Sequence, residues 1–86
     1  MMKKVVIVGQ GYVGLPISIR SVDMGYSVVG LDNDLGRVSK LLAGSSFVED
    51  VSNEVLSNSL ATGRFHPTTE SSDVSNFDVA FMTVIA

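Results

Sequence analysis

One stretch near the start of the chain, residues 5–16, constrains the fold more than any other. It opens with Val-Val-Ile-Val, a run of β-branched residues that is typical of a buried strand, and continues into Gly-x-Gly-x-x-Gly. Apolar residues at helical spacing follow, and Pro16 falls in the first helical turn, where its missing N–H is not needed. Strand, glycine turn and helix in this order predict a dinucleotide-binding turn.

Each of the three glycines has its own physical reason. Gly9 allows a sharp turn out of the strand, Gly11 lets bare backbone approach a pyrophosphate, and Gly14 lets the helix pack closely. The pyrophosphate is then expected at the helix N-terminus, where unpaired N–H groups and the helix dipole favour an anion. Because the chain has 8 glycines in 86 residues, this spacing alone is a weak signal.

The residues after the turn complete a strand–helix–strand unit. The helix is expected from about Tyr12–Val13 to Met24, and Gly25 is placed to end it in a left-handed conformation. A second β-rich run covers residues 26–32, so the unit fills about 30 residues, as such units usually do.

The second strand ends in Asp32, which follows Gly14 by 18 residues. At this distance an acidic residue is expected to bind the adenosine ribose, and it would repel a 2′-phosphate, so the pattern favours NAD over NADP. The alternative is a loop residue or helix cap, a role for which Asn33 and Asp34 compete. Arg37 lies one turn into the next helix, where it is either a further contact to the adenosine or a plain exposed cation.

The remainder of the chain supplies two more helices and two more strands. We expect helices over residues 35–43 and 52–61, an edge strand over 64–68 and a fourth strand over 77–85. Ser52 is a candidate cap for the last helix, and Pro67 suits only an edge strand. The fold class is therefore α/β: a partial Rossmann-type parallel sheet of about four strands in the order 3-2-1-4, with flanking helices.

Helical spacing also predicts which side chains face the core. The residues expected on the apolar faces of the three helices are Val13, Ile17, Ile19 and Val22; Leu35, Val38, Leu41 and Leu42; and Val55, Leu56, Leu60 and Ala61. The residues expected to face solvent on the first helix are Ser18, Arg20 and Asp23.

Composition excludes several classes of protein. The net charge of −3 and the absence of a dense basic patch argue against a nucleic-acid partner. No cysteine is present, and the single histidine, His66, is expected to be a surface residue, so no metal site is predicted. No apolar run is long enough for a membrane span, so a cytoplasmic location is expected by default.

Several motifs together resemble a known family, the nucleotide-sugar 6-dehydrogenases that act on UDP-glucose, UDP-N-acetylhexosamines and GDP-mannose. The most specific motif is Gly-Gln-Gly-Tyr-Val-Gly-Leu-Pro at residues 9–16. The other matching segments are 29–32 (Val-Gly-Leu-Asp), 47–51 (Phe-Val-Glu-Asp-Val), 61–65 (Ala-Thr-Gly-Arg-Phe), 68–69, 78–80 and 83–84. The resemblance covers essentially the whole chain.

The resemblance implies roles for individual residues. Tyr12 and Val13 would contact the pyrophosphate through their backbone N–H groups, and Asp32 would bind the adenosine ribose. Arg37 matches the basic position beside that ribose, and Thr83 would approach the nicotinamide. The expected cofactor-binding set is thus Gly9, Gly11, Tyr12, Val13, Gly14, Asp32, Arg37 and Thr83.

The resemblance also implies what this chain lacks. The family oxidises the C6 alcohol of a nucleotide sugar to a carboxylate in two NAD-dependent steps, with catalytic residues in the second half of the protein, one of them a cysteine. We therefore expect no catalytic residue within 1–86, which would form an incomplete NAD-binding domain that is inactive alone. A UDP-sugar substrate and a homodimer are expected for the full-length protein.

Two other interpretations stay open at this point. One is a fragment of another NAD-dependent dehydrogenase with the same opening unit, such as the 3-hydroxyacid or 6-phosphogluconate type. The other is a non-enzymatic NAD(H)-sensing module of the kind that gates ion transport. The motifs at residues 9–16 and 47–51 favour the nucleotide-sugar dehydrogenases over both.

Overall fold

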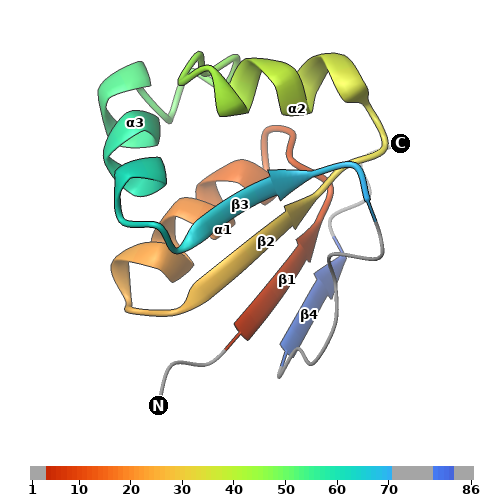
Figure 1. Cartoon of the computed structure of the whole chain (residues 1–86), viewed down its shortest axis with the longest axis vertical. Coiled ribbons are helices and arrows are strands. Elements are labelled where there is room, and N and C mark those ends of the chain that lie inside the picture. Colours follow the sequence, from red (N-terminus) through yellow and green to blue (C-terminus); the bar gives the residue numbers. More distant parts are fainter. Residues whose placement is uncertain (1–3, 71–78, 83–86) are drawn as a thin grey trace.

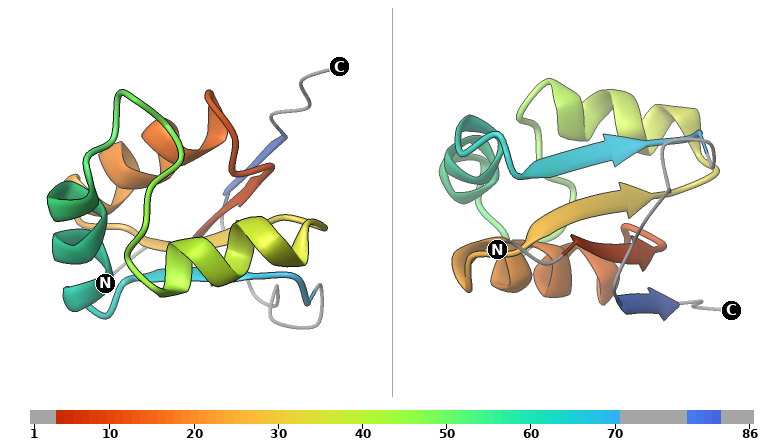
Figure 2. Two further views of the ribbon diagram at one scale, coloured as in Figure 1. Left: turned by 90° about the horizontal axis from the view of Figure 1, so that it is seen from above. Right: turned by 60° about the horizontal axis from the view of Figure 1, so that its bottom comes forward.

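Four parallel strands form one sheet in the computed structural model, which describes residues 4–70 and the backbone of residues 79–82 (Figure 1). The strands are β1 (Lys4–Val8), β2 (Ser27–Leu31), β3 (Phe65–Thr68) and β4 (Val79–Met82), and their order in the sheet is β3-β2-β1-β4. The predicted α/β class and the strand order 3-2-1-4 are both confirmed. Figure 2 shows β3 and β4 at opposite edges of the sheet.

Three helices connect the strands, and their ends follow the sequence signals. They are α1 (Gly14–Asp23), α2 (Leu35–Leu42) and α3 (Asn53–Ala61). Gly25 follows α1 with φ +96°, and its N–H donates to the Val22 carbonyl at 3.0 Å, as its predicted role requires. Ser52 caps α3, since its hydroxyl accepts from the Val55 N–H at 3.1 Å.

All three helices contribute to one hydrophobic core on one face of the sheet. Val5, Val28 and Phe65 occupy matching register positions on three strands, and all three side chains are buried. The helix and loop residues that pack on this face are Leu15, Ile19, Val22, Leu41, Val48, Val51 and Leu56. In Figure 1, α1 crosses behind the strands, whereas α2 and α3 lie near β3. The glycine turn between β1 and α1 is thereby held at the carboxyl end of the sheet.

The predicted solvent face of α1 is wrong at one residue. Ser18 is fully buried, and its hydroxyl donates to the Gly14 carbonyl at 2.9 Å and to Gln10 Oε1 at 3.0 Å. These bonds satisfy the hydroxyl inside the protein, so its polarity does not force it outward. Conversely, Val13 precedes α1 instead of belonging to its apolar face, and it is exposed.

The predicted apolar faces of the other helices are too wide. In α2 only Val38 and Leu41 are buried, whereas Leu35 and Leu42 are 69% and 59% exposed. This short helix contacts the sheet mainly along the edge strand β3, so a narrow stripe of apolar side chains on the helix is enough to cover that strand. The same holds for α3, where Leu56 is buried but Val55 and Ala61 are exposed.

Strand β3 closes one edge of the described sheet. The Arg64 carbonyl accepts from the Val28 N–H in β2, and the Thr68 carbonyl accepts from the Asp32 N–H directly after β2, so Arg64 and Thr68 direct their backbone groups inward. Backbone groups alternate in direction along a strand, which places position 67 with its backbone groups outward. Pro67 occupies that position and has no N–H to offer, as the sequence predicted for an edge strand.

The opposite edge of the described sheet is β4, which pairs with β1 in parallel register from Val5↔Val79 to Val8↔Met82. The predicted strand was longer, and its residues 77–78 and 83–85 lie outside the described residues.

Candidate cofactor-binding site

The first glycine of the motif makes the turn at the end of β1. Gly9 has φ +92°, a backbone conformation that a residue with a side chain rarely adopts. Its N–H donates to the carbonyl of Leu31 at 2.7 Å, which ties the end of β1 to the end of β2. The chain therefore leaves the strand in a fixed direction toward α1.

The N-terminus of α1 has no side-chain cap. Val13 stands at the cap position without a side-chain hydrogen bond, and the first turn contains no acidic residue. Within residues 4–70, the N–H groups of Tyr12 and Val13 have no hydrogen-bond acceptor, and both residues are exposed. The free N–H groups and the positive end of the helix dipole are thus available to an anionic ligand.

The middle and last glycines of the motif differ in their surroundings. A Cβ built on Gly11 would meet only Arg37 Nη1 within 4 Å, at 3.9 Å. Packing inside the described protein therefore does not require glycine here, whereas close approach of a diphosphate to the backbone would. Gly14 is buried as the first residue of α1.

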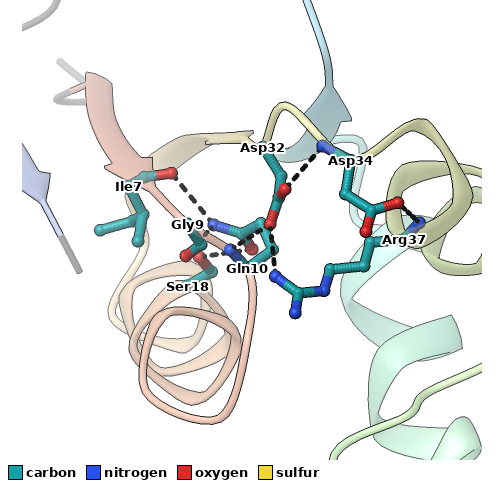
Figure 3. A network of polar contacts seen from close by, with 7 residues as sticks. All are labelled: Ile7, Gly9, Gln10, Ser18, Asp32, Asp34 and Arg37. Atoms are coloured by element: carbon teal, nitrogen blue, oxygen red, sulfur yellow. Dashed lines mark hydrogen bonds and ion pairs between the residues drawn. The ribbon is translucent and has the colours of Figure 1, made fainter. Parts of the chain in front are cut away.

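Asp32 directs its carboxylate toward the glycine turn (Figure 3). The carboxylate is held from both sides, because Oδ2 accepts from the Gln10 N–H and Oδ1 accepts from the Asp34 N–H, each at 2.8 Å. Asp32 is 4% exposed, and it is not the cap of α2. Asp34 is that cap, since its Oδ1 accepts from the Arg37 N–H at 3.1 Å. Asp32 is thus a fixed acceptor at the end of β2.

Arg37 extends from α2 toward the same place. Its Nη1 lies 3.5 Å from Asp32 Oδ2, a long ion pair, and its side chain is 48% exposed. The guanidinium carbon also lies 5.9 Å from the centre of the Phe47 ring, within range of a cation–π contact. Arg37 is therefore directed at the candidate site, not simply into solvent, and its long ion pair leaves Asp32 able to accept from a ligand hydroxyl.

The buried amide of Gln10 was not predicted as part of the site. Gln10 occupies the variable position between Gly9 and Gly11, yet it is fully buried. Its Nε2 donates to the Ile7 carbonyl at 3.0 Å and to the Gly9 carbonyl at 3.2 Å (Figure 3). One signal was present in the sequence: Gly30 inside the second strand marks a close approach by another group.

Thr83, the last member of the predicted set, lies outside the described residues. The remaining seven come from three neighbouring segments at the carboxyl ends of β1 and β2. They combine bare backbone, free N–H groups and a fixed carboxylate, and this donor and acceptor set fits the adenosine diphosphate half of a dinucleotide.

Comparison with known proteins decides between the interpretations. Residues 3–86 match the sequence model of the UDP-glucose/GDP-mannose dehydrogenase family, NAD binding domain. The chain belongs to this family. The cofactor of the domain is accordingly NAD, as the sequence predicted. The match argues against the other dehydrogenase types and the NAD(H)-sensing module.

Relatives with curated names agree with this assignment. The UDP-glucose 6-dehydrogenase of Rhizobium meliloti strain 1021 is 32% identical over 83 residues, which cover 94% of this chain and 19% of that protein. A UDP-N-acetyl-D-mannosamine dehydrogenase of Methanococcus maripaludis is 38% identical over 48 residues, or 56% of this chain and 11% of that protein. The chain thus spans about a fifth of the length of the first relative.

Solved structures share the fold. The UDP-D-ManNAc dehydrogenase from Pyrococcus horikoshii superposes with a TM-score of 0.89 at 28% identity, over 94% of this chain and 20% of that one. A ternary complex of GDP-mannose dehydrogenase from Pseudomonas aeruginosa gives a TM-score of 0.84 at 30% identity, over 93% and 19% of the two chains.

A membrane-spanning helix and a metal-binding cluster are both absent from residues 4–70 and 79–82. No helix there is long and apolar enough to cross a bilayer. Histidine and acidic side chains of these residues do not gather in any group of three that would hold a metal ion.

Proposed function

We propose that residues 1–86 form the first part of the NAD-binding domain of a longer nucleotide-sugar dehydrogenase. The observation that carries this proposal is the juxtaposition of an uncapped α1 N-terminus with the fixed carboxylate of Asp32, in a chain that matches the family's NAD-binding domain. The chain's share of 19% of its R. meliloti relative supports a longer protein.

Within this domain each predicted residue has a separate task. Gly9 and Gly14 shape the turn, Gly11 leaves room for the diphosphate, and the N–H groups of Tyr12 and Val13 donate to it. This assignment is supported by the positive φ of Gly9 and by the open space at Gly11.

The adenosine end of NAD is assigned to the next two residues. Asp32 accepts from the ribose hydroxyls and disfavours a 2′-phosphate, while Arg37 lines the adenine side of the ribose. The short bonds that orient Asp32 and the position of Arg37 beside it support these roles. Thr83 is proposed for the nicotinamide side on the family resemblance alone.

The reaction proposed for the complete protein is oxidation of the C6 alcohol of a UDP-sugar to a carboxylate in two steps. NAD, when bound, accepts the hydride in each step. Residues 1–86 would bind and orient that cofactor, and the catalytic groups would lie in the rest of the protein. Two of the relatives with curated names are UDP-sugar dehydrogenases, which supports the substrate class. We also propose a cytoplasmic homodimer for the complete protein.

Isothermal titration calorimetry of the chain with NAD⁺ and with NADP⁺ tests the cofactor part of this proposal. We expect NAD⁺ to bind measurably and NADP⁺ to bind at least about 10-fold more weakly, since the 2′-phosphate would face the Asp32 carboxylate. Tighter binding of NADP⁺ would contradict the assigned role of Asp32. Absence of binding to either cofactor by a folded chain would contradict the proposed function.

A further inference from the structure

The side-chain amide of Gln10 has almost all of its hydrogen-bonding capacity occupied inside the protein. Its two N–H groups donate to the carbonyls of Ile7 and Gly9. Ile7 lies near the end of β1, and Gly9 is the first residue of the glycine turn. Its Oε1 accepts from the Ser18 hydroxyl at 3.0 Å. A buried amide satisfied in this way is held in a single orientation.

Ser18 connects this amide to the start of α1. Its hydroxyl lies within hydrogen-bond distance of both Gln10 Oε1 and the Gly14 carbonyl, at 3.0 Å and 2.9 Å, and shares its one proton between them. The strand end, the turn and the first helical turn are therefore joined through one side chain.

Gly30 provides the space that the amide occupies. A Cβ at Gly30 would lie 2.7 Å from Gln10 Cδ, 2.8 Å from Gln10 Oε1 and 3.0 Å from Phe65 Cε1. Contacts this short require the neighbours to move, so any larger residue in the middle of β2 would displace the Gln10 side chain. The Gln10 backbone adds a second connection, because its N–H donates to Asp32 Oδ2 at 2.8 Å.

We propose that Gln10 is a positioning residue for the cofactor: its buried amide fixes the glycine turn relative to Asp32, with Ser18 orienting the amide and Gly30 making room for it. The side chain itself is buried beneath the turn, so it acts through the backbone that it holds. This inference rests on the proposed function, since it concerns how the same site is kept in shape for NAD.

Replacement of Ser18 tests the proposal with a matched control on the same helix. Ser18→Ala removes the hydroxyl that orients Gln10, and Ser21→Ala removes a hydroxyl that donates to the Ile17 carbonyl at 2.9 Å and has no bond to Gln10. Both changes delete the same kind of bond within α1, and alanine favours the helix in both. Circular dichroism establishes the temperature at which each variant is folded, and all binding is measured there.

We expect Ser18→Ala to raise the Kd of the chain for NAD⁺ by about 5- to 10-fold, which is the loss typical of one well-formed hydrogen bond. Ser21→Ala should leave that Kd within about 2-fold of the parent value. Gln10→Met, which is similar in size but cannot donate, should weaken binding at least as much as Ser18→Ala. If Gln10→Met does not fold, the pair of serine variants still decides the question.

Amide hydrogen exchange at Gly9, Gln10 and Leu15, followed by NMR without ligand, is a second readout that loss of stability alone does not predict, because the N–H groups of these residues are hydrogen-bonded around the turn. We expect local exchange to accelerate in Ser18→Ala and to stay at the parent rate in Ser21→Ala. Equal NAD⁺ affinity and equal turn exchange in the two serine variants would overturn the proposal. If the parent chain fails to bind NAD⁺, the proposed function fails, while the exchange comparison still tests the role of Gln10 in the turn.

Discussion

At the scale of single residues, Asp32 joins two segments of the chain. Its carboxylate accepts from the Gln10 N–H in the glycine turn and from the Asp34 N–H before α2. A carboxylate has about four lone pairs, so Asp32 retains acceptor capacity beyond these two bonds and its long ion pair with Arg37. Asp32 therefore stabilises the fold even without a ligand, and its substitution is expected to affect both the stability of the chain and its binding of NAD⁺.

Asp32→Ala should weaken NAD⁺ binding about 10-fold or more, since bonds from ribose hydroxyls to a carboxylate contribute roughly 1.5–3 kcal/mol each. Calorimetry on the folded variant measures the change, and Asp23→Ala at the exposed end of α1 controls for lost negative charge. An NAD⁺ affinity that stays at the parent value would remove Asp32 from the site.

Gly30→Ala should lower the free energy of unfolding by about 1–3 kcal/mol, because its methyl group would overlap Gln10 and press on Phe65. Urea denaturation measures the loss. The double variant Gly30→Ala, Gln10→Ala should recover part of this stability, since the overlap with Gln10 is gone. Stability in Gly30→Ala equal to that of the parent would show that the side chains move aside without cost.

The sequence predicted most members of the candidate site because each has a local signature. The glycine spacing and the acidic residue after the second strand both depend on short stretches of chain. Gln10 was missed because its role depends on Gly30 and Ser18, which reach it only once two strands and a helix are assembled. Ser18 was wrongly predicted to face solvent for the same reason. A serine counts as polar in the sequence pattern, but in the fold its hydroxyl donates to Gln10 Oε1 and the Gly14 carbonyl.

At the scale of elements, the three helix starts differ in how they are capped. The first turns of α2 and α3 are capped by Asp34 and Ser52, while α1 has no side-chain cap. Two starts are thus stabilised by side chains of the protein itself, and the third is the one that we propose binds the diphosphate. Removing a cap that is not part of the candidate site should therefore separate stability from binding.

Ser52→Ala should destabilise the chain by about 1 kcal/mol, as the loss of an N-cap usually does, without changing the Kd for NAD⁺. Thermal denaturation and calorimetry measure the two quantities on the same sample. Ser52→Asp is the matched control, because its carboxylate can also cap the helix and interacts well with the dipole. A weaker affinity for NAD⁺ in Ser52→Ala would mean that α3 is coupled to the site.

Element positions were predictable from the chain, but helix faces were less so. Strands and helix ends follow from β-branched runs, capping residues and glycines, which act locally. The number of residues that each helix buries depends on the strands and helices against which it packs. Since α2 lies along the edge strand, Leu35 and Leu42 extend past the surface that Val38 and Leu41 cover.

At the scale of the whole molecule, the described sheet has the order of the first four strands of a six-stranded dinucleotide-binding sheet. Its described strands run β3-β2-β1-β4, and β4 is at the edge of that sheet. A chain of 86 residues also buries a smaller share of its surface than a full domain, about 60–65%. Both features favour low stability when the chain is made alone.

We expect the isolated chain to unfold at a low temperature or to self-associate, because β4 pairs with only one strand in the described sheet and an unpaired edge favours pairing with another strand. Sedimentation velocity and calorimetric melting measure the two outcomes, and saturating NAD⁺ should raise the melting temperature. A monodisperse monomer with a sharp transition at high temperature would contradict this expectation.

The isolated chain should also show no NADH formation when it is incubated with NAD⁺ and UDP-glucose or UDP-N-acetylmannosamine. It contains no cysteine to form a covalent intermediate with the sugar. Absorbance of NADH measures turnover, with a complete UDP-glucose 6-dehydrogenase as the positive control. Appreciable reduction of NAD⁺ would place catalytic groups within these residues.

Pro67 makes the two borders of the sheet unequal. Strand β1 lies inside the sheet, β2 and β3 follow it toward one edge, and β3 at that edge contains Pro67. The next strand, β4, lies on the other side of β1. We therefore expect further strands of the proposed longer protein to pair beside β4. In that protein we expect the part of the cofactor beyond the adenosine to lie at the carboxyl ends of β1 and β4, where the winding direction of the sheet reverses.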